Sequence, residues 1–141
     1  MEIRRLGPHD VDLVLASGGL FDAPPRREWT ERFLGRDGHH LLFAFVDDVA
    51  AGFVSGIEIT HPDKGTEMLL YELGADDAFR RRGIGRALVR ALLELATELS
   101  CRDMWVPVEE GEDVALATYR SAGAEEPEPG TTLTWPISPA S

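Results

Sequence analysis

The stretch from Met68 to Ser100 constrains the fold more than any other part of the chain. Its β-type residues 68–75 lead through the turn Arg80-Arg81-Arg82-Gly83-Ile84-Gly85 into a segment with apolar residues at helical spacing. The spaced residues, which would share one helix face, are Ala87, Leu88, Ala91, Leu92, Leu95, Ala96 and Leu99. A strand that passes directly into a long helix predicts an α/β domain.

The remaining elements are predicted from similar patterns. Helices are expected to start at Pro8 and at Pro24-Pro25, and a third is expected from Asp113 to Ala122, capped by Asp113 and closed by Gly123. Strands are predicted at 3–6, 41–46, 49–59, 68–75, 104–108 and 131–137, with a tight hairpin at Asp47-Asp48. The predicted architecture is one mixed sheet flanked by helices.

Length and composition indicate one small domain. A chain of 141 residues with 43% apolar content can bury one core, so we expect a single domain over 1–141 with a frayed end at about 138–141. Trp29, Trp105 and Trp135 are expected in the core or at an interface. Cys101 has no second cysteine to pair with, so we expect a passive thiol.

The charge and the apolar runs restrict the partners and the location. A formal charge of −11 disfavours nucleic acids and anionic membranes and favours a cationic partner. No apolar run approaches the roughly 20 residues that span a bilayer, and the first residues lack a signal-peptide pattern, so we expect a cytoplasmic protein. The four histidines show no ligand spacing, and no metal is predicted; they are His9, His39, His40 and His61.

The turn between strand and helix has the composition of an anion site. Free amides at a helix start can bind phosphate oxygens, Gly83 and Gly85 allow close approach, and the flanking arginines add charge. An ordinary glycine turn with solvated arginines is the alternative. The chain has no lysine in the turn for a Walker loop, and Leu88 stands where a dinucleotide fingerprint needs Gly or Ala.

The turn resembles the acetyl-CoA motif of the GNAT acetyltransferase superfamily, which is Arg or Gln, two residues, Gly, one residue, then Gly or Ala. The predicted order of elements resembles that superfamily as well. The resemblance implies a mostly antiparallel mixed sheet with a splayed acetyl-CoA cleft between the strands at 68–75 and 104–108. It also implies a set of cofactor-binding residues: Leu73, Gly74, Ala75, Arg80, Arg81, Arg82, Gly83, Ile84, Gly85 and Arg86.

A closer likeness is to the type I aminoglycoside 3-N-acetyltransferases. The matching stretches are Arg5-Leu6-Gly7-Pro8, Leu20-Phe21, Tyr71-Glu72-Leu73 and residues 114–119. That family tends to have Asp where this chain has Glu72 and Glu109, and Leu where it has Thr118. The likeness implies acetylation of an aminoglycoside, with antibiotic resistance as its consequence. Because many relatives pair, it also leaves a homodimer open.

Two residues are candidates for the chemistry. Strand alternation predicts that Glu72 shares a face with Leu70 and Gly74, and apolar neighbours would raise its pKa towards that of a general base. A carboxylate paired with an arginine is the alternative. Tyr119 matches, by the resemblance, the family tyrosine that protonates the leaving thiolate. Its alternative role is a half-buried helix residue. The same resemblance makes one amide of residues 73–75 an oxyanion donor.

Four carboxylates are predicted to bind ammonium groups of a polyamine sugar: Glu109, Glu110, Glu112 and Asp113. Some of them could instead be solvated loop charges, and Asp113 could serve only as a cap. Three functions therefore remain open. They are acetylation of an aminoglycoside 3-amino group, acetylation of another small amine or a protein amino group, and acyl-CoA binding without turnover.

Overall fold

The computed structural model describes residues 1–79 and 82–137. Its strands are β1 (Glu2–Arg5), β2 (His39–Val46), β3 (Val49–His61), β4 (Gly65–Ala75) and β5 (Asp103–Trp105). Its α-helices are α1 (Val11–Ala16), α2 (Arg27–Leu34), α3 (Ile84–Glu98) and α4 (Asp113–Ser121). Short 3₁₀ turns are η1 (Pro8–Asp10), η2 (Gly18–Leu20) and η3 (Asp77–Phe79).

The five strands form one sheet in the order β1-β2-β3-β4-β5. The first four run antiparallel to their neighbours, and β5 alone pairs in parallel with β4. The predicted hairpin is confirmed: Asp47 and Asp48 both have positive φ, 50° and 65°, as a two-residue type I′ turn requires. A mixed, mostly antiparallel sheet is therefore observed, as predicted.

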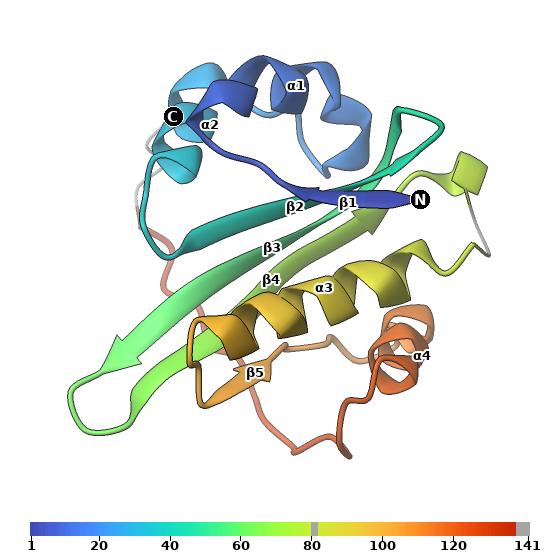
Figure 1. The fold of residues 1–141 in the computed structure, drawn as a ribbon. Coiled ribbons are helices and arrows are strands. Elements are labelled where there is room, and N and C mark those ends of the chain that lie inside the picture. The colour runs from blue at the N-terminus through green and yellow to red at the C-terminus, as the bar shows by residue number, and fades with distance from the viewer. Residues whose placement is uncertain (80–81, 138–141) are drawn as a thin grey trace.

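Helices cover both faces of this sheet (Figure 1). On one face, α3 packs against a core that includes Leu42, Val54 and Met68, and α4 packs against α3. On the other face, α1 and α2 cover a second core that includes Phe43 and Phe53. The strands supply both cores because neighbouring residues point to opposite faces.

A β-bulge in β4 changes which residues share a face. Leu70 pairs with Gly56 and Glu72 pairs with Ser55, so Tyr71 is an extra residue without a partner on β3. Leu70 therefore faces the α3 core, whereas Glu72 faces the opposite side with Ser55. The prediction that Glu72 and Leu70 share a face was wrong, because uninterrupted alternation does not hold across a bulge.

Two predicted strands differ from the structure. β5 ends at Trp105 rather than Val108, where Pro107 lacks an amide to donate to a neighbouring strand. The segment 131–137, predicted as a final strand, has no regular secondary structure and pairs with no described strand. Leu133, Trp135 and Ile137 are consequently exposed.

The helices lie where they were predicted, but α1 and α2 begin at Val11 and Arg27 rather than at the preceding prolines, and one cap differs. The N-cap of α4 is Glu112, no side chain caps the helix, and Asp113 is its first residue. The predicted capping role of Asp113 was therefore wrong, although a carboxylate in the first turn still interacts favourably with the helix dipole. Gly123, with φ of 103°, follows the helix end as predicted.

No helix in the described part of the chain is both long and apolar enough to cross a bilayer.

Candidate active site

The start of α3 presents unpaired backbone amides. Gly83 is its N-cap with φ of 71°, a left-handed conformation that favours glycine. The first helical hydrogen bond runs from the amide of Ala87 to the carbonyl of Gly83 at 3.0 Å. The amides of Ile84, Gly85 and Arg86 therefore have no acceptor within the helix. No heavy atom lies within 4 Å of the place where a Cβ on Gly83 would stand. This open helix terminus fits a phosphate group.

The arginines of the turn are only partly described. Arg82 is exposed, with its guanidinium carbon 5.6 Å from the centre of the Phe79 ring, and Arg86 is exposed on the first turn of α3. Arg80 and Arg81, both predicted to bind the cofactor, lie outside the described residues. The contribution of these two arginines therefore stays a prediction.

Beside this helix terminus, the pairing of β4 with β5 stops. The register joins Glu67 to Asp103, Met68 to Met104 and Leu69 to Trp105, and no further pair follows. The β5-side backbone edge of β4 beyond Leu69, which includes the predicted residues Leu73, Gly74 and Ala75, is thus free of strand pairing in the described chain. This edge is available to main-chain bonds from an extended ligand arm.

Three elements meet at this edge. A methyl group on Gly85 would lie 3.2 Å from Cγ2 of Thr118 and 3.8 Å from Cδ2 of Leu73. The start of α3, strand β4 and helix α4 therefore converge around Gly85. Tyr119 follows Thr118 and is buried in the same core. Burial, assisted by the negative charge of Glu112, raises the pKa of the Tyr119 phenol, which keeps it protonated and able to donate.

Glu72 opens into a pocket on the other face of β4. This pocket has a volume of about 180 Å³ and lies between α2 and the sheet. Burial, with the nearby charge of Asp22 adding to it, raises the pKa of Glu72, in the direction predicted from the sequence. Glu72 forms no ion pair within the described chain, and its amide donates to Oγ of Ser55 at 3.1 Å. The alternative of an arginine-paired carboxylate is not seen among these residues.

The lining of this pocket is mostly apolar and was missed in the sequence. Phe21, Trp29, Phe33 and Phe53 surround it together with Ser55 and Glu72. The Arg26 guanidinium lies 4.5 Å from the centre of the Trp29 ring, and it also pairs with Glu28 at 2.6 Å. The helical spacing of Trp29 and Phe33 was visible, but that pattern alone suggested a core face.

The tryptophans are surface residues in the chain as described. Trp29, Trp105 and Trp135 are 53%, 44% and 79% exposed, so the core part of the prediction was wrong, and an interface role stays a prediction. Trp29 contributes to the pocket wall, Trp105 ends the edge strand β5, and Trp135 belongs to the unpaired segment.

The four predicted substrate-binding carboxylates cluster just before and at the start of α4. Glu109, Glu110, Glu112 and Asp113 are all exposed, and Gly111 between them has φ of 93°. The amide of Glu112 donates to the carbonyl of Glu109 at 3.2 Å, which closes the loop. None of the four lines the pocket at Glu72. The acidic loop and Glu72 are thus separate features.

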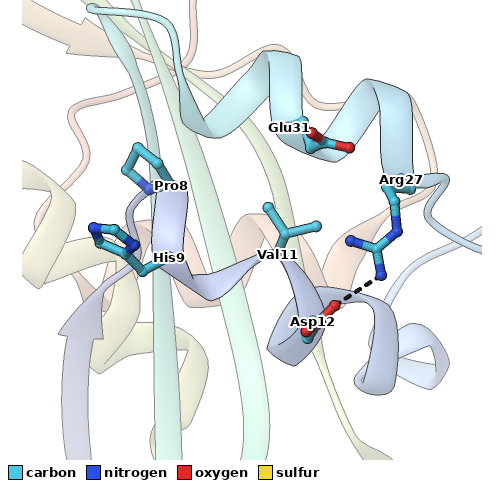
Figure 2. A pocket seen from close by; sticks show the side chains of 6 residues that line it. All are labelled: Pro8, His9, Val11, Asp12, Arg27 and Glu31. Carbon is cyan, nitrogen blue, oxygen red and sulfur yellow. Dashed lines mark hydrogen bonds and ion pairs between the residues drawn. The ribbon is translucent and has the colours of Figure 1, made fainter.

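Another hollow, of about 370 Å³, lies between η1, α1 and α2 (Figure 2). Its lining residues come from the beginning of the chain and include none of the predicted site residues. Arg27 donates a hydrogen bond to Asp12 at 2.7 Å across this hollow, so the arginine of its lining is already paired with a carboxylate of its lining.

Histidines and carboxylates form pairs rather than a larger ligand set. Nε2 of His40 lies 2.7 Å from Glu58, and Nε2 of His61 lies 2.9 Å from Glu67. Arg5 also contacts Nδ1 of His40 at 2.8 Å, so this ring lies between an arginine and a carboxylate. Within the described residues, no group of three or more such side chains could hold a metal ion.

Curated relatives resemble part of the chain. It is 37% identical over 101 residues to a mycothiol acetyltransferase of Salinispora arenicola, covering 66% of this chain and 31% of that protein. It is 28% identical over 102 residues to the [ribosomal protein bS18]-alanine N-acetyltransferase of Salmonella typhimurium, covering 70% and 65%. Each match thus covers less than two thirds of the relative's length.

Solved structures share the fold over nearly the whole chain. An aminoglycoside acetyltransferase from an uncultured soil metagenomic sample, in complex with sisomicin, superposes with a TM-score of 0.86 at 20% identity, over 97% of this chain and 96% of that one. The aminoglycoside N-acetyltransferase AAC(6′)-Iy in complex with CoA superposes with a TM-score of 0.80 at 20% identity, over 96% and 95%.

The family model described as acetyltransferase (GNAT) family matches residues 12–124, which include α1, the whole sheet from β2 to β5, and α4. With the open start of α3 beside the unpaired edge of β4, the match identifies the chain as a member of the GNAT family of acetyltransferases.

Proposed function

We propose that this chain transfers the acetyl group of acetyl-CoA directly to an amine of an aminoglycoside, at the 3-amino group of the sugar. The observation that carries the proposal is the placement of Glu72 and Leu73. These adjacent residues of β4 point to opposite faces, one into the pocket and the other towards Gly85 and Thr118. A single strand thereby separates an acceptor side from a donor side.

The donor side fits acetyl-CoA. The open amides at the start of α3 would hold the pyrophosphate, with Arg82 and Arg86 supplying charge. The unpaired edge of β4 at Leu73, Gly74 and Ala75 would bind the pantetheine arm, and one amide there would stabilise the oxyanion. Acetyl-CoA supplies a thioester that an amine can attack without a covalent enzyme intermediate.

The two candidate side chains would divide the proton transfers. Glu72, whose pKa is raised, would accept the proton that the acceptor ammonium loses, directly or through water. Tyr119, which stays protonated, would give its proton to the departing thiolate and recover one from solvent. Holding amine and thioester together at the unpaired edge of β4 would supply much of the rate.

The aminoglycoside assignment rests on charge and on resemblance. Four exposed carboxylates gather at 109–113 in a chain of net charge −11, and they suit a polycationic sugar. The likeness of the sequence to type I 3-N-acetyltransferases and the fold shared with a sisomicin-bound acetyltransferase support the same acceptor. Because the AAC(6′)-Iy structure shares the fold too, the fold does not distinguish the 3-amino group from the 6′-amino group. Identifying which nitrogen is acetylated therefore tests the 3-amino assignment.

The aromatic pocket favours a second candidate, the amino group of a peptide. Phe21, Trp29 and Phe33 offer an apolar surface beside Glu72, which would suit an amine next to an apolar side chain better than a hydroxylated ring. A relative that acetylates a ribosomal-protein alanine gives this candidate a precedent.

The experiment measures CoA release with gentamicin, sisomicin and kanamycin, and separately with peptides that begin with alanine, leucine or lysine. Product NMR would locate the modified nitrogen. Acetylation at the sugar's 3-amino group is the expected result. Modification at the 6′-amine would refute the regiochemistry, activity on peptides alone would refute the aminoglycoside assignment, and acetyl-CoA binding without transfer to any amine would refute catalysis.

A further inference from the structure

Two buried hydroxyl groups in the lining of the pocket at Glu72 donate no hydrogen bond within the described chain. Thr30, on α2, is 7% exposed, and Ser55, on β3, is 4% exposed. Oγ of Ser55 accepts the amide of Glu72 at 3.1 Å but donates to none of the described residues. Oγ1 of Thr30 has no partner among them either. Each hydroxyl therefore has a hydrogen that a molecule in the pocket could accept.

Folding alone does not explain these two side chains. A threonine within a helix can donate to the carbonyl one turn earlier, as Thr97 does to Leu93 at 2.8 Å, but Thr30 does not. The other buried polar side chain of the described residues, His40, has partners at both ring nitrogens. A buried hydroxyl without an acceptor lowers stability, and an apolar side chain of similar shape would avoid that loss. The unused hydrogens of Thr30 and Ser55 therefore point to a ligand.

The volume of the pocket limits what can occupy it. An apolar cavity of about 150 Å³ admits benzene, so this pocket of about 180 Å³ has room for one six-membered ring. Phe21, Trp29 and Phe33 can contact the C–H faces of such a ring. These aromatic side chains alone favour an amine beside an apolar group, but two hydroxyl donors favour a ring with oxygen substituents. An amino-sugar ring offers both kinds of contact.

Ser55 lies next to the candidate base. Its Oγ accepts the amide of Glu72, and the two residues are paired across β3 and β4 at the bulge. An amine held at the Glu72 carboxylate would therefore bring its neighbouring atoms towards the Ser55 hydroxyl. An oxygen on the carbon next to the amine suits this arrangement. Thr30, on the α2 wall of the pocket, would bind an oxygen elsewhere on the ring.

We propose that Ser55 and Thr30 bind oxygen substituents of the acceptor, so that the pocket selects a ring with an oxygen on the carbon next to its amine. This inference rests on the proposed role of the pocket as the acceptor site and extends it from the amine to the groups beside it. A peptide amine also has an oxygen at this separation, its first carbonyl. Its apolar side chain, however, would leave the hydrogen of Thr30 without an acceptor.

The first test compares two amines that differ in one oxygen, trans-2-aminocyclohexanol and cyclohexylamine. Their dissociation constants from the CoA-bound protein are measured by NMR titration, which requires no acetyl transfer. The wild-type protein should bind the aminoalcohol about fivefold more tightly, the value of one neutral hydrogen bond. Ser55→Ala should bind the two amines within about twofold of each other. A merely structural role of Ser55 would weaken both amines equally and keep their ratio.

The second test removes the other hydroxyl. Thr30→Val keeps the shape of the side chain, and the dissociation constant of kanamycin from the CoA-bound protein should rise about fivefold. The melting temperature should not fall, because Oγ1 of Thr30 has no partner in the folded chain as described. Thr97→Val is the matched control. It removes a hydroxyl from an exposed position on α3 and should leave kanamycin affinity unchanged.

Four results would overturn the proposal. These are equal wild-type affinity for the two cyclohexyl amines, a preference that survives in Ser55→Ala, kanamycin binding that is absent in the wild type or unchanged in Thr30→Val, and tighter wild-type binding of leucinamide than of the aminoalcohol. The last result would assign the pocket to a peptide amine. A wild-type protein that shows the expected binding preferences but acetylates none of these amines would refute the proposed function and support the role of the two hydroxyls.

Discussion

Two glycines of β3 allow α3 to pack closely on the sheet, and replacing each one separately tests whether this packing holds the proposed cofactor site in place. A Cβ on Gly52 would lie 2.9 Å from the carbonyl oxygen of Gly74 and 3.0 Å from Cγ2 of Ile84. A Cβ on Gly56 would lie 2.7 Å from Cδ1 of Leu92 and 2.9 Å from Sδ of Met68. Gly52 therefore faces the start of α3, and Gly56 faces its middle.

Both alanine variants should lose stability, and Gly52→Ala should lose more, because its Cβ meets the backbone carbonyl of Gly74 whereas that of Gly56 meets the side-chain ends of Leu92 and Met68. Overpacking in a dense core destabilises by about 1–3 kcal/mol. Alanine lowers the conformational entropy of the unfolded chain relative to glycine, which stabilises the folded state by about 0.4–1 kcal/mol. The net loss is then about 0–2.6 kcal/mol. With an unfolding entropy of about 2.1 cal/mol/K per residue over 141 residues, the melting temperature should fall by at most roughly 9 °C.

The two variants should differ in acetyl-CoA affinity. Gly52→Ala presses Ile84 away from β4, so the amides at the start of α3 shift relative to the pantetheine edge, and the dissociation constant should rise on the order of tenfold. Gly56→Ala should leave it within about twofold, because Leu92 lies two helical turns further along. Calorimetric titration and thermal unfolding measure both quantities. Equal affinity losses in the two variants, or normal affinity in a destabilised Gly52→Ala, would refute the reasoning.

Three further outcomes are expected. The pKa of Glu72 is raised in the folded state, so its contribution to stability is fully present below the ordinary carboxyl pKa of 4.5 and is lost as pH rises through the folded value. In urea unfolding, the free energy of unfolding of Glu72→Gln should therefore increase relative to that of the wild type above pH 4.5. A difference that does not change with pH would contradict this. Tyr119→Phe should lower kcat about 100-fold or more with unchanged acetyl-CoA affinity and melting temperature; unchanged kcat in steady-state assays would remove Tyr119 from the mechanism. Trp29→Ala should raise the acceptor KM several-fold without altering the acetyl-CoA KM, and the reverse pattern would exclude Trp29 from the acceptor side.

The order of elements could be predicted because its signals are local. The hairpin at Asp47-Asp48 follows from residues that tolerate positive φ, and α3 follows from apolar spacing over four turns. The open start of α3 was also foreseeable, since Gly83 and Gly85 stand between an apolar strand and an amphipathic helix. Each of these signals lies within a few residues of the feature it predicts.

The pocket at Glu72, which we propose as the acceptor site, could not be predicted because it depends on contacts between distant segments. Trp29 and Phe33 show the spacing of a core face, and only the packing of α2 beside Glu72 turns them into a pocket wall. The segment 131–137 shows the opposite error. Its alternation predicts a strand, but no strand forms there, because alternation does not supply a partner strand.

The bulge at Tyr71 has the largest consequence for the proposed chemistry. Without it, alternation from Leu70 would direct Glu72 into the α3 core, where a carboxylate would lie among Met68, Val54 and Leu88. The bulged conformation at Tyr71 instead turns Glu72 to the pocket beside α2 and Leu73 to the side of Gly85. The same bulge follows the last residue of β4 that pairs with β5, Leu69. The bulge therefore lies both where β4 loses its β5 partner and where Glu72 turns towards the pocket. Deleting Tyr71 would make Leu70 and Glu72 neighbours, and regular alternation would then keep Glu72 on the pocket face opposite Leu70.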